Sequence, residues 1–161
     1  MTRRRGFTLI ELLIVVAIIG VIAAIAIVNM INAIQRAKQK RSMGDMKTLA
    51  TAIEAYATDW NHYPAAAGFA MPSGLSLPTG TLGEASSSIS PTYLRVLPLV
   101  DGWNSWFNYG TSVSKNDFVV RSTGADGIAE TTPAYGATTD FNADIILVDS
   151  TFVQFPEGAQ K

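Results

Sequence analysis

One carboxylate, Glu11, stands where a charged group is costly, which makes it the side chain most readily tied to a function. It precedes a run with no charged residue from Leu12 to Gln35. A carboxylate in hydrocarbon without a partner costs several kcal/mol. Two ordinary explanations are a Glu that reaches interfacial water and a first-turn acid favoured by the helix dipole. If Glu11 lies in hydrocarbon instead, we expect it to need a cationic partner.

The other titratable residues do not form a recognisable catalytic set. The chain of 161 residues has no cysteine, which excludes disulfides, thiolate zinc sites and cysteine nucleophiles. Its one histidine, His62, stands beside the turn at Pro64, and no general base can be argued from it. The sequence has no Ser–His–Asp set and no phosphate-binding glycine loop. We therefore expect no enzymatic activity and no required cofactor.

The charges are divided unevenly along the chain. Residues 1–47 hold eight basic and two acidic residues, a net +6, whereas residues 48–161 hold four basic and eleven acidic residues, a net −7. The overall charge of −1 argues against a general nucleic-acid binder, which would be basic. The asymmetry instead suggests a basic segment near a membrane or polyanion and a separate acidic globular part.

The uncharged run from Leu12 to Gln35 is long enough to cross a membrane. At 1.5 Å per residue, a helix of that length reaches roughly 36 Å, against a hydrocarbon core of about 30 Å. A secretory signal peptide would have a shorter apolar core followed by a cleavage site. A plain single-pass anchor would not explain Glu11. We therefore expect a membrane helix that continues into the next part of the chain.

The segment Arg5-Gly6-Phe7-Thr8-Leu9-Ile10-Glu11-Leu12 resembles the class III signal of type IV pilins and type II secretion pseudopilins. The resemblance implies a leader over residues 1–6, cleavage by a prepilin peptidase between Gly6 and Phe7, and N-methylation of Phe7. It also implies that Glu11 neutralises the new amine of a neighbouring subunit during assembly. One departure is Val28, which stands where the family usually has a proline that favours local unwinding.

The resemblance implies an α+β pilin fold, in which one long helix packs on a small antiparallel sheet of three to four strands. Apolar residues at helical spacing extend the helix from about Thr8 to Trp60, with a buried face at Met46, Leu49, Ile53, Tyr56 and Trp60. We divide it into a polymerisation half, 7–35, and an amphipathic half, 36–63. A variable loop at 64–91 follows, then a head at 92–161 with strands at 118–122, 145–148 and 152–155.

The segment Ser122-Thr123-Gly124-Ala125-Asp126-Gly127 is similar to a calcium-binding segment of major pseudopilins, and Asp144 matches one of the acids that follow it there. Ala143 stands where the family has another Asp and cannot bind. Calcium takes six to eight oxygens, and those available are Asp126, Asp140, Asn142, Asp144 and backbone carbonyls. The alternative is a pair of ordinary Asp-rich turns. A calcium site at these residues is thus one of two open interpretations.

The resemblance favours the major pseudopilin of a type II secretion system. The implied partners are copies of itself, minor pseudopilins, prepilin peptidase, an inner-membrane platform protein, an assembly ATPase and the lipid bilayer; nucleic acid is not expected. The implied location is the bacterial inner membrane with the head in the periplasm, then a periplasmic pseudopilus or a cell-surface filament. Two alternatives stay open: a type IV pilin for adhesion, motility or DNA uptake, and a membrane-anchored sensor or binding module that never polymerises.

Overall fold

The computed structural model describes residues 6–66, 80–158 and 160. One helix, α1 (Leu9–Trp60), is followed by two short helical turns, η1 (Leu82–Glu84) and α2 (Ser86–Ile89). The contacts divide the chain into two compact units, Met1–Ile34 and Gln35–Lys161. The helix prediction is confirmed to within a residue at its start, and α1 continues without a break through Val28. Asn61, with a φ of 55°, follows its last residue in the left-handed conformation typical of helix C-termini.

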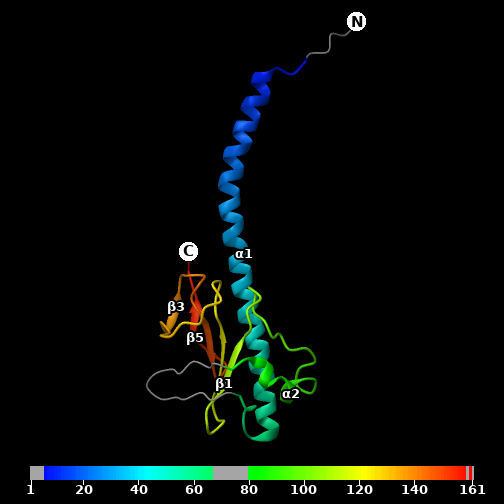
Figure 1. Ribbon diagram of the computed structural model, residues 1–161, viewed down its shortest axis with the longest axis vertical. Helices are drawn as coiled ribbons and strands as arrows, with labels where there is room; N and C mark the ends of the chain where they lie inside the picture. The colour runs from blue at the N-terminus through cyan, green and yellow to red at the C-terminus, as the bar shows by residue number, and fades with distance from the viewer. Residues whose placement is uncertain (1–5, 67–79, 159, 161) are drawn as a thin grey trace. The chain divides into compact units, whose positions relative to one another are not determined.

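The second unit contains a five-stranded sheet (Figure 1). Its strands are β1 (Asn108–Thr111), β2 (Phe118–Ser122), β3 (Gly136–Thr138), β4 (Ile145–Val148) and β5 (Thr151–Pro156), in the spatial order β1-β2-β4-β5-β3. All neighbouring pairs are antiparallel except β3 and β5, which are parallel. The three expected strands are confirmed. The expected three to four antiparallel strands are also confirmed, as β1, β2, β4 and β5, and β3 adds a short parallel strand at one edge. The positions of β1 and β3 were not predicted, because neither carries an alternating apolar pattern.

The core of this unit lies between the C-terminal half of α1 and one face of the sheet. From α1, Met46, Leu49 and Ile53 are fully buried, as the helical spacing predicted. They belong to one cluster with sheet residues that include Phe118, Val120 and Leu147. A smaller cluster of Val119, Ile146 and Val148 forms on the opposite face, since successive strand residues point to opposite sides. The prediction was wrong for Trp60, which is 60% exposed.

Trp60 is exposed because it is the last residue of α1. Its ring stacks on Tyr56 with the ring centroids 6.0 Å apart, and its Nε1 donates to the hydroxyl of Tyr93. The aromatic group therefore closes the end of the helix rather than filling the core.

A loop at residues 101–105 fixes the sheet unit to α1 by close backbone contact. The N–H of Gly102 donates to Ser42 Oγ at 2.9 Å, and Ser42 Oγ donates to the carbonyl of Lys38 at 3.0 Å. Asp101 holds the loop itself, because its Oδ1 accepts from the N–H groups of Trp103 and Ser105, each at 2.9 Å.

Candidate functional site

The N-terminal end of α1 is capped by Thr8 and Glu11. Thr8 donates to Glu11 Oε2 twice, from its N–H at 2.9 Å and from its Oγ1 at 2.8 Å. The N–H of Glu11 donates back to Thr8 Oγ1 at 3.3 Å. This is a capping box, in which a Thr and a Glu three residues later satisfy two otherwise unpaired N–H groups. Glu11 is therefore held at the helix start by its own chain.

The residues beside the capping box are open. Phe7 is 73% exposed, and a Cβ placed on Gly6 would meet nothing within 4 Å. Gly6 and Phe7 therefore lie in a non-helical segment just before Leu9, where a protein could approach the backbone. The rest of the predicted leader, residues 1–5, lies outside the described residues. Cleavage and methylation at Gly6 and Phe7 stay predictions.

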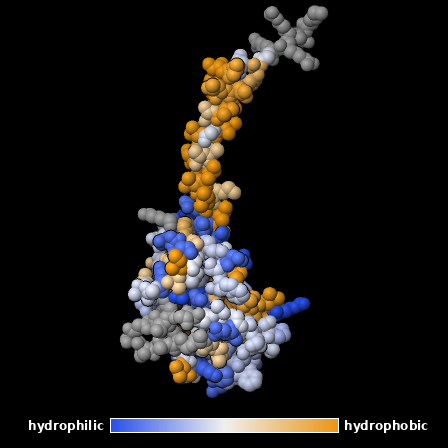
Figure 2. Space-filling model, viewed as in Figure 1, coloured by the Kyte–Doolittle hydropathy of each residue, from blue (hydrophilic) through white to orange (hydrophobic). Residues whose placement is uncertain are grey.

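The first unit presents apolar side chains on all sides of α1. Large hydrophobic residues from Leu9 to Ile34 are exposed throughout, and Figure 2 shows this half of the helix as almost uniformly hydrophobic. By length and composition, α1 is a helix that could cross a membrane. An exposed apolar surface of this size needs lipid or other helices to cover it.

The two acidic segments of the head lie side by side. The N–H of Ala125 donates to the carbonyl of Phe141 at 2.9 Å, and a Cβ on Gly124 would come within 2.4 Å of the carbonyl oxygen of Asn142. However, Asp126 Oδ1 accepts from the N–H of Ile128, and Asp140 Oδ1 accepts from the N–H of Asn142. Asp126 and Asp140 thus cap their own turns.

The structure does not gather the expected ligands around one point. Within the described ranges, no three Asp, Glu, His or Cys side chains form a group that could hold a metal ion. Asp144 is fully buried, whereas Asp126, Asp140 and Asn142 lie at the surface. Calcium binding by Asp126, Asp140, Asn142 and Asp144 therefore stays a prediction.

Asp144 instead faces a buried cation that the sequence analysis missed. Arg121 of β2 places its Nη1 3.6 Å from Asp144 Oδ2, and both side chains are almost completely buried. Burial raises the pKa of Asp144 to about 6 and lowers the pKa of Arg121. For both groups, the loss of water outweighs their mutual attraction. One signal was available: Arg121 directly follows three apolar residues, Phe118 to Val120, in a predicted strand, and an arginine buried there must have a partner.

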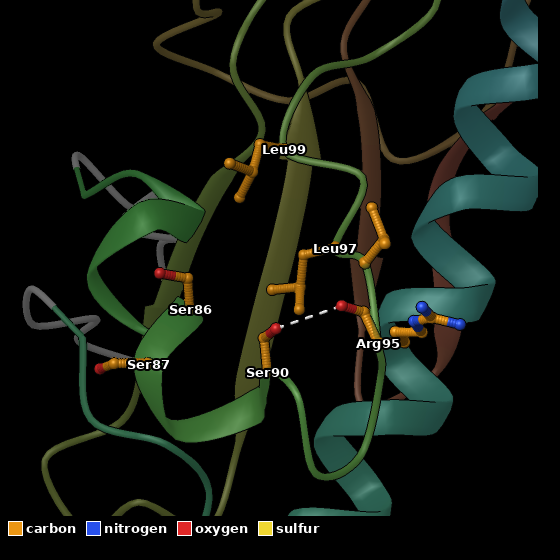
Figure 3. Close-up of a pocket in the computed structure, with 7 residues that line it drawn as sticks. Ser86, Ser87, Ser90, Arg95, Leu97 and Leu99 are labelled. Carbon is orange, nitrogen blue, oxygen red and sulfur yellow. Dashed lines mark hydrogen bonds between the residues drawn. The ribbon is translucent and has the colours of Figure 1, made fainter.

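One surface pocket lies between α2 and the segment at residues 95–99 (Figure 3). Its serine hydroxyls are engaged by backbone: Ser86 Oγ donates to the carbonyl of Gly83 and Ser90 Oγ to the carbonyl of Arg95. In Figure 3 the guanidinium of Arg95 points away from these hydroxyls. The described residues that line the pocket include no histidine or carboxylate that could activate a serine.

Two family models and one curated relative match this chain. Residues 1–27 match the family model of the prokaryotic N-terminal methylation motif, and residues 29–145 match that of type II secretion system protein G. The chain is 34% identical over 129 residues to the type II secretion system core protein G of Pseudomonas aeruginosa, covering 79% of this chain and 89% of that protein. No solved structure matches this chain. The chain therefore belongs to the protein G family of type II secretion systems, the structural major pseudopilins.

Proposed function

We propose that this chain polymerises through the first half of α1 into the pseudopilus of a type II secretion system. The observation that carries the proposal is Glu11, the only carboxylate in the first unit, at the head of an apolar surface that is exposed throughout. Helices of neighbouring subunits would cover that surface. The family match supports the secretion system as the setting.

Processing would precede assembly. A prepilin peptidase would cut between Gly6 and Phe7 and methylate the new amine of Phe7. The open backbone at Gly6 supports access, because no atom outside its immediate chain neighbours lies within 4 Å of a Cβ built there. Removal of residues 1–6 deletes three arginines that would otherwise favour the cytoplasmic side.

The new amine of Phe7 and the carboxylate of Glu11 would pair between neighbouring subunits. Each charge is costly in hydrocarbon, and a close pair offsets much of that cost. The capping box does not prevent this pairing. Thr8 uses only Glu11 Oε2, and an ionised carboxylate has about four acceptor sites. Thr8 would therefore fix the position of the carboxylate while the neighbour supplies the cation.

The proposed setting follows from the same parts of the chain. The precursor would lie in the bacterial inner membrane with its head in the periplasm. Minor pseudopilins, a platform protein and an assembly ATPase would then add it to a filament that pushes folded substrates outward. The four basic residues from Arg36 to Arg41, immediately after the uncharged run, would contact lipid headgroups before assembly.

The test is a Glu11→Val variant, with Ile10→Val as the matched control at the neighbouring exposed position. We expect Glu11→Val to be cleaved and inserted as in the wild type but to form few filaments on overexpression, as counted by electron microscopy. Ile10→Val should assemble normally. Wild-type filament yield from Glu11→Val would refute the role of the carboxylate.

Two alternative functions would give different observations from a pseudopilus subunit. A type IV pilin would be encoded beside a retraction ATPase rather than beside a secretin and other secretion components. A membrane-anchored sensor would be processed but stay monomeric, so that overexpression would yield no fibres. The 34% identity to a core secretion protein over most of the chain favours the pseudopilus.

A further inference from the structure

Arg121 brings a positive charge into the centre of the sheet unit. Its Nε and Nη2 donate to Asn108 Oδ1 of β1, at 3.2 and 3.1 Å. Its Nη1 donates to the carbonyl of Glu130 at 3.4 Å and lies 3.6 Å from Asp144 Oδ2. The guanidinium therefore connects two strands, the loop that follows β2, and the residue that precedes β4.

The carboxylate of Asp144, which faces Arg121, also binds this loop. Asp144 Oδ2 accepts from the N–H of Glu130 at 3.0 Å. Gln154 of β5 donates from its Nε2 to Glu130 Oε2 at 2.8 Å and to the carbonyl of Asp144 at 2.9 Å. Its Oε1 accepts from the N–H of Ala134 at 2.7 Å. The loop at residues 123–135 is thus anchored by side chains from β2, from β5 and from Asp144, the residue before β4.

A calcium ion would need a different arrangement of these side chains. It takes six to eight oxygens at 2.3–2.6 Å, and its carboxylate ligands converge on it. Here the oxygens of Asp126 and Asp140 accept from their own turns, and a guanidinium already faces Asp144. Asp144 Oδ1 has no hydrogen-bond partner among the described residues, but a single buried oxygen is not a coordination sphere. The arrangement of these side chains therefore fits the guanidinium of Arg121 better than a bound calcium ion.

We propose that the guanidinium of Arg121 is the resident cation of this head, and that it holds the 123–135 loop in place of a divalent metal ion. The head then folds with the same stability whether or not calcium is present. This property belongs to the head and does not depend on filament formation.

The proposal predicts strong coupling between Arg121 and Asp144. Removing one partner leaves the other charge buried without its opposite charge, which destabilises more than removing both. The effects of the two single substitutions should therefore not add in the double variant.

The test uses the full-length chain in detergent and follows tryptophan fluorescence during thermal unfolding. All three tryptophans, Trp60, Trp103 and Trp106, lie in the Gln35–Lys161 unit, so the signal reports on the head. The wild type is compared in excess calcium and in excess EGTA. The variants are Arg121→Met, Asp144→Asn and the double variant, with Arg95→Met as the control at an exposed arginine.

We expect the wild-type Tm to be the same in calcium and in EGTA. Arg121→Met and Asp144→Asn should each lower the Tm by about 10 °C or more, and the double variant should melt above at least one of them. Arg95→Met should leave the Tm unchanged. A wild-type Tm that rises in calcium would overturn the proposal, as would an Arg121→Met variant as stable as the wild type. Should both single variants fail to fold, the wild-type comparison and the folding of the double variant still decide it.

Discussion

Replacing Gly102 with alanine tests the close approach of the loop at residues 101–105 to the backbone of α1. An added Cβ would lie 2.3 Å from the carbonyl oxygen of Lys38 and 2.8 Å from its carbonyl carbon and its Cα. Carbon atoms in contact normally lie about 3.5–4.0 Å apart, so the loop must move by about 1 Å. The obstacle is backbone of α1, which cannot rotate away as a side chain could.

The cost of Gly102→Ala follows from two effects. Forced overpacking typically costs about 1–3 kcal/mol. Moving the loop also weakens the hydrogen bond from Gly102 to Ser42 Oγ, which is worth about 1 kcal/mol. We therefore expect a loss of about 3 kcal/mol in the free energy of unfolding, or a decrease of about 10 °C in Tm for a unit of this size.

The assay is thermal unfolding of the full-length chain in detergent, followed by tryptophan fluorescence. Trp103 is adjacent to the substituted residue, and its Nε1 donates to Gln35 Oε1. Its emission should shift to the red in the variant as the loop separates from α1. The matched control is Gly44→Ala on the same helix, where a Cβ would meet nothing within 4 Å and helix propensity should add about 0.5–1 kcal/mol. A Gly102→Ala variant that melts with the wild type would show that the loop does not depend on this contact.

Two further predictions concern the core of the head. Burial raises the pKa of Tyr109, whose hydroxyl donates to the carbonyl of Pro64, so above about pH 10 the unfolded chain releases a proton that the folded chain retains. The free energy of unfolding should therefore fall by up to about 1.4 kcal/mol per pH unit in alkali, and urea titrations should find this slope reduced in Tyr109→Phe. An equal slope in both proteins would exclude Tyr109 as its source. Ile53→Ala should cost about 2–5 kcal/mol because Ile53 is fully buried, whereas Val113→Ala, at a side chain that is 91% exposed, should have no measurable effect; similar urea midpoints for the two would contradict the assigned core.

The parts of the fold that could be predicted are those with a regular apolar pattern. The strand Phe118–Ser122 and the strand Ile145–Val148 were predicted at their observed bounds. The strand Asn108–Thr111 was missed because Asn and Gly are poor strand formers. The strand Gly136–Thr138 has only three residues and pairs with a distant segment, which no local pattern can indicate.

The candidate sites also differ in whether neighbouring residues in the chain could reveal them. The position of Glu11 was evident from a motif in adjacent residues. The spacing of Thr8 and Glu11 is also that of a capping box, but this box was recognised only in the structure. The pair of Arg121 and Asp144 joins residues far apart in the chain, so the sequence could show only that a buried arginine needs a partner. Which carboxylate would meet it depended on the pairing of β2 with β4.

The two edges of the sheet affect how closely copies of the head can pack together. Along one edge, the N–H of Leu82 donates to the carbonyl of Phe107, and the N–H of Tyr109 donates to the carbonyl of Gly80, so that β1 already has a neighbour. At the other edge, β3 has three residues, and Gln160 donates to its last carbonyl at Thr138. Exposed strand edges are templates for aggregation when copies meet at high density. A head with occupied or very short edges can be packed closely with many copies of itself and remain separately folded.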